Sequence, residues 1–171
     1  MSKSISFPGL KDYMDQIQSL DKNLLKLCEE ITYDGAKVVA DACKSEINGL
    51  PTTSEKQVLA AWKKFQKTGN AQPISLTPEQ KEGLVDSMGL AKMRNDKGFI
   101  NTKLGFDGYN NVVTKRWPKG QPNAMLARSV NSGSSAFRKN PFMQRVERQS
   151  RSRAVKAMNE RCDRELKKYV K

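Results

Sequence analysis

The chain has 171 residues, a formal net charge of +13 and no histidine. A chain of this length is typical of a single domain that buries about two-thirds of the surface of its unfolded form. The lack of histidine removes the commonest general base, metal ligand and physiological pH switch, which argues against most enzyme classes. Its longest apolar runs are too short for a membrane span or a secretory signal, so we expect it to mature in a cytosol.

The positive charge is concentrated in the C-terminal third. Residues 1–114 contain 15 Lys and Arg against 14 Asp and Glu, whereas residues 115–171 contain 16 against 4. Such asymmetry is typical of a surface that meets nucleic acid, an anionic membrane or an acidic protein. The cysteines Cys28, Cys43 and Cys162 are odd in number and far apart, which favours reduced, packed thiols over a disulfide framework or a metal site.

The N-terminal part of the chain has helical periodicity. Apolar residues recur at helical spacing from Leu10 through Tyr13 and Met14 to Ile17, and then along residues 21–48. The second pattern predicts a long amphipathic helix that Gly49 ends. Gly35 lies inside it, either as a point of close approach by another backbone or as a tolerated interior glycine.

Two capping boxes predict two further helices. Ser54 and Gln57 start a helix over 54–68, with an apolar face formed by Val58, Leu59, Trp62 and Phe65. Thr77 and Gln80, with Pro78 in the first turn, start a shorter helix that reaches about residue 88.

From Gly89 the apolar period changes to two, as expected for strands. Residues 90–94 and 99–106 are predicted to form a hairpin around the turn at 95–98, and residues 112–116 and 125–130 to add strands. The sequence therefore predicts an α+β fold, in which a small antiparallel sheet is flanked by a long N-terminal and a long C-terminal helix. We expect one domain over 1–171, with a helical part at 9–88, the sheet at 89–131 and the last helix at 141–169.

Residues 125–143 predict a structural joint between the sheet and the last helix. The segment reads as a strand, a loop that bends at Gly133 and a helix start. Asn140 is the expected cap, Pro141 fits the first helical turn, and Phe142 starts the apolar stripe. Such a joint sets how the helix leaves the sheet and contains no group suited to catalysis.

The last helix carries the candidate partner interface. Its apolar positions form one patch at Phe142 and Val146 and another from Val155 to Tyr169, with the polar segment 149–153 between them. We expect this middle segment to cross solvent or to meet a partner. The candidate interface consists of the basic residues around it and an aromatic anchor in a Pro/Gly loop: Arg145, Arg148, Arg151, Arg153, Lys156 and Trp117.

Three interpretations of the basic helix are open. Arginine forks suit phosphate or carboxylate recognition, which fits direct nucleic-acid binding or an acidic protein partner. Alternatively, the helix is a solvated face whose charges pair with its own acidic residues. No aromatic stacking platform or DNA-reading motif decides between them.

Enzymatic motifs are weak in this chain. Residues 19–22 match S-x-x-K and residues 67–69 match K-T-G of penicillin-recognising enzymes, but the S-D-N element is missing and K-T-G closes a helix. No glycine-rich phosphate cradle occurs. We therefore predict no catalytic, cofactor or metal site.

Several short segments together resemble those of one known family. They are the helix segment 83–88, the strand 100–106, the loop Trp117-Pro118-Lys119-Gly120, the strand and turn at 127–134, and the Pro141-Phe142 pair before a long terminal helix. In these segments the chain resembles the tail-completion or head-to-tail joining proteins, also called neck or minor tail proteins, of long-tailed bacteriophages and prophages. Two features depart from the family pattern: Asn131 stands where an acidic residue is frequent, and the helix 54–68 looks like an insertion.

The resemblance implies an α+β structural protein without enzymatic activity or cofactor. Such a protein assembles as a hexameric ring, completes the tail and joins it to the head around a passage for the genome. The implied partners are further copies of the chain, the tail tube protein, and the head connector or head-completion protein, with non-specific contact to genome DNA and no membrane. The implied location is the tail or neck of a virion assembled in the bacterial host cytoplasm. The alternative is a basic nucleic-acid-binding protein that uses the C-terminal helix, and an enzyme of unknown type is a remote third.

Overall fold

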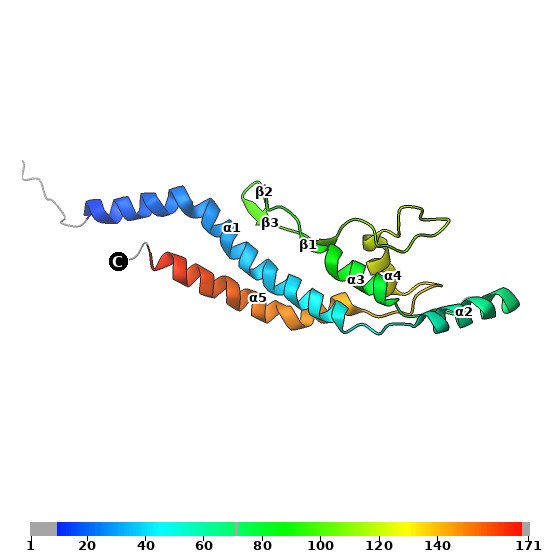
Figure 1. The fold of residues 1–171 in the computed structure, drawn as a ribbon. Coiled ribbons are helices and arrows are strands. Elements are labelled where there is room, and N and C mark those ends of the chain that lie inside the picture. Colours follow the sequence, from blue (N-terminus) through cyan, green and yellow to red (C-terminus); the bar gives the residue numbers. More distant parts are fainter. Residues whose placement is uncertain (1–9, 71, 169–171) are drawn as a thin grey trace, which may run out of the picture.

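The computed structural model describes residues 10–70 and 72–168. Within these ranges the order of elements is α1 (Leu10–Asn48), α2 (Glu55–Thr68), α3 (Pro78–Ser87), β1 (Met88–Leu90), β2 (Arg94–Asp96), β3 (Phe99–Asn101), β4 (Leu104–Phe106), α4 (Asn123–Ser132) and α5 (Phe142–Leu166). The predicted α+β class is confirmed, with a long helix before and after the strands (Figure 1). The side chains of Leu10, Tyr13, Met14 and Ile17, and the whole of residue 9 and Tyr169, lie outside what is described.

The long helices α1 and α5 lie side by side along the molecule (Figure 1). Arg145 near the start of α5 pairs with Glu46 near the end of α1, whereas Arg161 near the end of α5 pairs with Glu30. The two helices are therefore antiparallel. The two N-terminal helical patterns belong to one continuous helix, α1.

The two helices are in close contact at Gly35. A Cβ at this position would lie 2.6 Å from Cγ of Met158 and 3.6 Å from the carbonyl oxygen of Ala154. A hydrogen at this position lets α5 pack directly on the backbone of α1. Of the two interpretations, the structure favours close approach, but it is the Met158 side chain and not the backbone of α5 that comes nearest.

The middle of α5 is packed against its own chain, which contradicts the prediction of a free segment. Ser150 is only 1% exposed, and Ala154 is buried as well. The Ser150 hydroxyl donates to the carbonyl oxygen of Val146 at 2.7 Å, so its polar group is satisfied within the helix. A small side chain paired in this way can be buried without interrupting the helix packing.

The hydrophobic core lies where α1 and α5 meet α3, β1 and α4. It consists mainly of Ala42, Cys43, Ile47, Leu50, Leu76, Leu84, Met88, Leu126, Ala127, Val130, Phe137, Phe142 and Val146. The rings of Phe106 and Phe142 meet edge to face, with centroids 6.4 Å apart, a geometry that aromatic pairs favour. The strand region and the start of α5 therefore share one core.

Helix α3 and the hairpin follow the local sequence signals. The N–H of Gln80 donates to Oγ1 of Thr77 at 3.2 Å, and the N–H of Thr77 donates to Oε1 of Gln80 at 3.0 Å. This is the predicted capping box. At the hairpin tip Lys97 and Gly98 have φ of 55° and 91°, as a two-residue turn between strands requires.

The hairpin ribbon is divided into two short ladders. Strand β2 pairs with β3, and β1 pairs with β4 in the register Met88 opposite Phe106. Between them the N–H of Ala91 donates to the carbonyl oxygen of Lys103 at 2.8 Å, which links the ladders along one ribbon. The predicted hairpin is confirmed, but its strand bounds are not. The first strand is split at residues 91–93, which make up most of the predicted 90–94, the second is split at 102–103, and the turn is limited to 97–98.

The other two predicted strands are wrong. Residues 112–116 form no strand, and residues 125–130 lie inside α4. The buried positions of α4 include Leu126, Ala127 and Val130, which share one face of a helix and not of a strand. The part of the family resemblance that requires a strand before the turn at 134 is therefore wrong too.

Helix α2 forms as predicted but does not contribute to the core. The N–H of Ser54 donates to Oε1 of Gln57 at 3.0 Å, and Gly69 ends the helix with a φ of 67°. None of its residues is buried, and Leu59 and Trp62 are 57% and 54% exposed. The helix extends away from the body of the molecule (Figure 1).

We predict that Gly35→Ala lowers the free energy of unfolding by about 1–3 kcal/mol, because the added methyl group overlaps the side chain of Met158. Without that overlap the change should stabilise a helix by about 1 kcal/mol. Urea denaturation of Gly35→Ala in the natural and Met158→Ala backgrounds measures both effects. A stabilising Gly35→Ala in the natural background would contradict the close approach.

Candidate partner interface

The start of α5 is held by Asn131 and not by Asn140. The N–H of Met143 donates to Oδ1 of Asn131 at 3.1 Å, so the last turn of α4 caps α5. Oδ1 of Asn140 accepts instead from the guanidinium of Arg145 at 2.7 Å. Pro141 occupies the cap position just before Phe142, the first helical residue. The predicted roles of Asn140 as the cap and Pro141 as a first-turn residue are therefore wrong.

The other two joint residues behave as predicted. Gly133 has a φ of 81°, and a Cβ there would lie 2.9 Å from Cβ of Lys139. The chain can therefore fold back after α4 only with glycine at this position. Phe142 is fully buried, so its ring anchors the start of α5 in the core.

Arg145 has a structural role, because its guanidinium donates hydrogen bonds within the chain. Its Nε donates to Oε2 of Glu46 at 2.7 Å, while Oε1 of Glu46 accepts from the side chain of Gln149 at 2.8 Å. With the bond to Asn140, these contacts join three segments of the chain. Arg145 is therefore not among the side chains that are available to a partner.

The other basic residues of the predicted interface are spread over about half of the circumference of α5. Nε of Arg153 donates to the carbonyl oxygen of Gln149 at 2.9 Å, and Lys156 lies 3.8 Å from Glu160. Residues two apart in a helix, such as Arg151 and Arg153, point about 160° apart. The five basic side chains therefore do not form a single patch.

Arg148 and Arg151 are the two arginines that remain available. Both are exposed, and neither forms a hydrogen bond or ion pair with any residue that the structure describes. They are three residues apart and so lie on neighbouring positions of the helix surface. They form the strongest part of the predicted interface.

An apolar groove runs beside Arg151 between α1 and α5. Its volume is about 520 Å³, its apolar lining includes Val39, Val146, Ala154 and Val155, and Glu147 and Arg151 are the charged residues that line it. Interfaces combine buried apolar centres with arginine more often than the rest of a protein surface does. The groove and Arg151 together have the composition of a protein-binding surface.

Trp117 lies on a different part of the molecule from this surface. The loop 111–121 lies beyond α3 and α4, away from α5 (Figure 1). The ring of Trp117 is half-buried, and the guanidinium carbon of Arg116 lies 5.5 Å from its centroid. The structure therefore does not bring Trp117 together with the basic helix.

A network of charged residues at the far end of α5 was not predicted from the sequence. Arg161 contacts Glu30 and lies 3.8 Å from Asp34 and 3.4 Å from Glu165. The hydrogen bond to Glu30 raises the pKa of Arg161, and the hydrogen bond from Lys168 lowers the pKa of Glu165. The four-residue spacing of Glu30 and Asp34 is the signal that could have indicated a shared cation.

Other chemistry in the described part of the chain is limited. Cys28, Cys43 and Cys162 are free thiols, and burial raises the pKa of Cys43 to about 11. Residues 10–70 and 72–168 contain no helix that could span a membrane. Comparison of the chain with models of protein families, with curated proteins and with solved structures gave no match.

We predict that Phe142→Ala lowers the free energy of unfolding by about 3–5 kcal/mol, because it leaves a cavity in the shared core. Pro141→Ala is the matched control at the neighbouring position and should have a much smaller effect. Thermal and denaturant unfolding measure both changes. Equal and negligible effects of the two substitutions would show that α5 is not anchored by Phe142.

Proposed function

We propose that this protein is a structural component of a long-tailed bacteriophage virion, which completes the tail and joins it to the head connector. The observation that supports this most is the way the family-like segments meet in space. The segment 83–88 supplies Leu84 and Met88 to the core that also contains Phe142, and Phe106 of the hairpin packs on the ring of Phe142. Segments far apart in the sequence thus support the same helix start.

In this proposal the protein acts by binding and not by catalysis. Copies form a hexameric ring at the end of the tail tube, around the passage for the genome. The groove beside Arg151 meets an acidic surface of the tail tube protein, or of the head connector or head-completion protein. Assembly takes place in the bacterial host cytoplasm, and the function requires no cofactor.

The alternative function is nucleic-acid binding, and the free side chains of Arg148 and Arg151 favour it. Two phosphate contacts would give a salt dependence with a logarithmic slope of about −1.8 on duplex DNA. Affinity would then fall about tenfold between low and physiological salt. Titration of random duplex into the protein at several salt concentrations separates the two functions, since a joining protein should show little binding at physiological salt.

We predict that changing Arg148, Arg151 and Arg153 together to Ser leaves folding nearly intact, because all three side chains are exposed. The same change should prevent tails from joining to filled heads, since interface arginines often dominate binding. Complementation of a phage that lacks this gene, with electron microscopy of free heads and tails, gives the result.

A matched control changes three exposed lysines of α1 to Ser: Lys22, Lys37 and Lys44. It removes the same charge from a different surface and should complement normally. Normal virion yield from a folded triple arginine variant would exclude the basic surface of α5 from the joining contact.

A further inference from the structure

Helix α2 exposes an apolar face that no described part of the chain covers. Leu59 and Trp62 are more than half exposed, and the rings of Trp62 and Phe65 lie 5.8 Å apart. The opposite side of the helix faces the flanking segments at 51–53 and 72–75. We call residues 55–70 the α2 arm. The hydrogen bond from Ser54 to Gln57 at its start and Gly69 at its end define a formed helix that presents an aromatic pair to the surroundings.

A row of lysines borders this apolar face. Lys56, Lys63 and Lys67 are exposed and lie on one side of the helix, because their spacings of seven and four residues bring them back to similar angles. The arm ends at Gly69 and Asn70, which follow the last turn. Its surface is therefore apolar along one face and basic along the adjacent edge.

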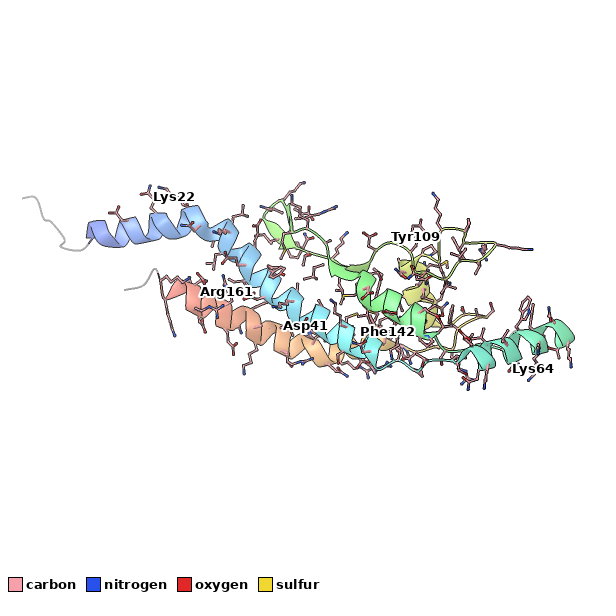
Figure 2. The ribbon with its side chains drawn as sticks, in the orientation of Figure 1. Lys22, Asp41, Lys64, Tyr109, Phe142 and Arg161 are labelled. Atoms are coloured by element: carbon pink, nitrogen blue, oxygen red, sulfur yellow. The ribbon has the colours of Figure 1, made fainter. Side chains whose placement is uncertain are left out.

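A second unusual surface lies between α3, the loop 107–111 and the start of α4. It is a pocket of about 420 Å³ whose charged lining is Glu79, Glu82, Asp86 and Asp107. We call it the acidic pocket. Tyr109, which Figure 2 labels, borders the pocket and is 59% exposed, so an apolar ring adjoins the carboxylates.

Two buried amide groups in the acidic pocket have one end without a partner. Asn110 and Asn123 are 4% and 2% exposed, and Nδ2 of Asn110 and Oδ1 of Asn123 have no hydrogen-bond partner. The other ends are used by the chain: Oδ1 of Asn110 accepts from the N–H of Val112 at 3.0 Å, and Nδ2 of Asn123 donates to the carbonyl oxygen of Asp107 at 3.1 Å.

These bonds fix which ends remain unpaired, and buried polar groups without a partner are rare in proteins. One free donor and one free acceptor suit a ligand that both donates and accepts, such as a peptide or carboxamide group. The surrounding carboxylates suit a cation next to it. The pocket therefore fits a basic segment of polypeptide.

We infer that the α2 arm of one copy docks on the acidic pocket of a second copy. The lysine row faces the carboxylates, the aromatic pair covers Tyr109, and the Gly69–Asn70 end offers the peptide and carboxamide groups that Asn110 and Asn123 lack. Within one copy the arm extends away from α3 and α4, so it does not reach its own pocket (Figure 1).

The contact joins two different surfaces and is therefore heterologous. Such contacts repeat from copy to copy and close into a ring when the rotation allows it. The inference thus adds a contact between copies to the proposed ring, but it does not depend on the virion function. Purified protein tests it separately from the complementation experiment.

The test is sedimentation of the full chain over a wide concentration range at physiological salt, where repulsion between the net charges is screened beyond about 8 Å. The arm variant is Trp62→Ala with Phe65→Ala, and the pocket variant is Glu82→Lys with Asp86→Lys. All four side chains are exposed, so both variants should fold. The control is Leu25→Ala with Tyr33→Ala, which changes an equally exposed apolar pair on α1.

We expect the natural protein to associate increasingly with concentration and the control to behave like it. The arm variant and the pocket variant should each associate at least tenfold more weakly. An equimolar mixture of these two variants should form a one-to-one complex and nothing larger, since one supplies an intact pocket and the other an intact arm. Lys63→Glu with Lys67→Glu should weaken association. Adding Glu82→Lys and Asp86→Lys to that same chain should restore association, because the charges on the arm and on the pocket are then exchanged.

Three results would overturn the inference. They are a natural protein that stays monomeric at its highest soluble concentration, an arm variant that associates as strongly as the control, and a mixture of arm and pocket variants that stays monomeric. The first of these would indicate that a different protein covers the α2 arm.

Discussion

The close packing of α5 on α1 is the interaction on which the rest of the structure depends. At Gly35 the helices touch through backbone and the side chain of Met158, and a buried serine, Ser150, continues the contact in the middle of α5. Ion pairs hold both ends, because Arg145 binds Glu46 and Arg161 binds acidic residues of α1. Since α3, β1 and α4 attach to the end of this pair where α1 finishes and α5 begins, its geometry determines where the core can form.

The sequence predicted those features whose causes lie within a few residues of one another. Capping boxes and a two-residue turn act between neighbours, so the starts of α2 and α3 and the hairpin tip at Lys97 and Gly98 were correct. Helix α4 was missed although Leu126, Ala127 and Val130 recur at helical spacing, because a short segment with several apolar residues can be mistaken for a buried strand. Pro122 before it and Gly133 after it were the available helix signals. The burial of Ser150 was missed because an apolar pattern counts serine as polar, even when its hydroxyl is paired within its own helix.

The candidate site was predicted only in part, for a related reason. Periodicity identified Phe142 as a core residue, since a large apolar ring at the start of a helix's apolar stripe is usually buried, and Phe142 is. The cap, in contrast, comes from Asn131, which precedes the loop, and a contact between separate segments is invisible to spacing rules. The apolar face of α2 shows the limit most clearly, because periodicity indicates that a helix has such a face and not what covers it.

The distribution of charge along the sequence also differs from its distribution in space. The C-terminal third holds the excess of basic residues, but two of its arginines, Arg145 and Arg161, are neutralised by acidic residues of α1. Arg148 and Arg151 of α5 stay unpaired among the described residues, and the lysines of α2, from the nearly neutral N-terminal part, form a second basic surface. The fold therefore divides the basic side chains between separate surfaces on α5 and α2, so the charge gradient along the sequence does not become one continuous basic face.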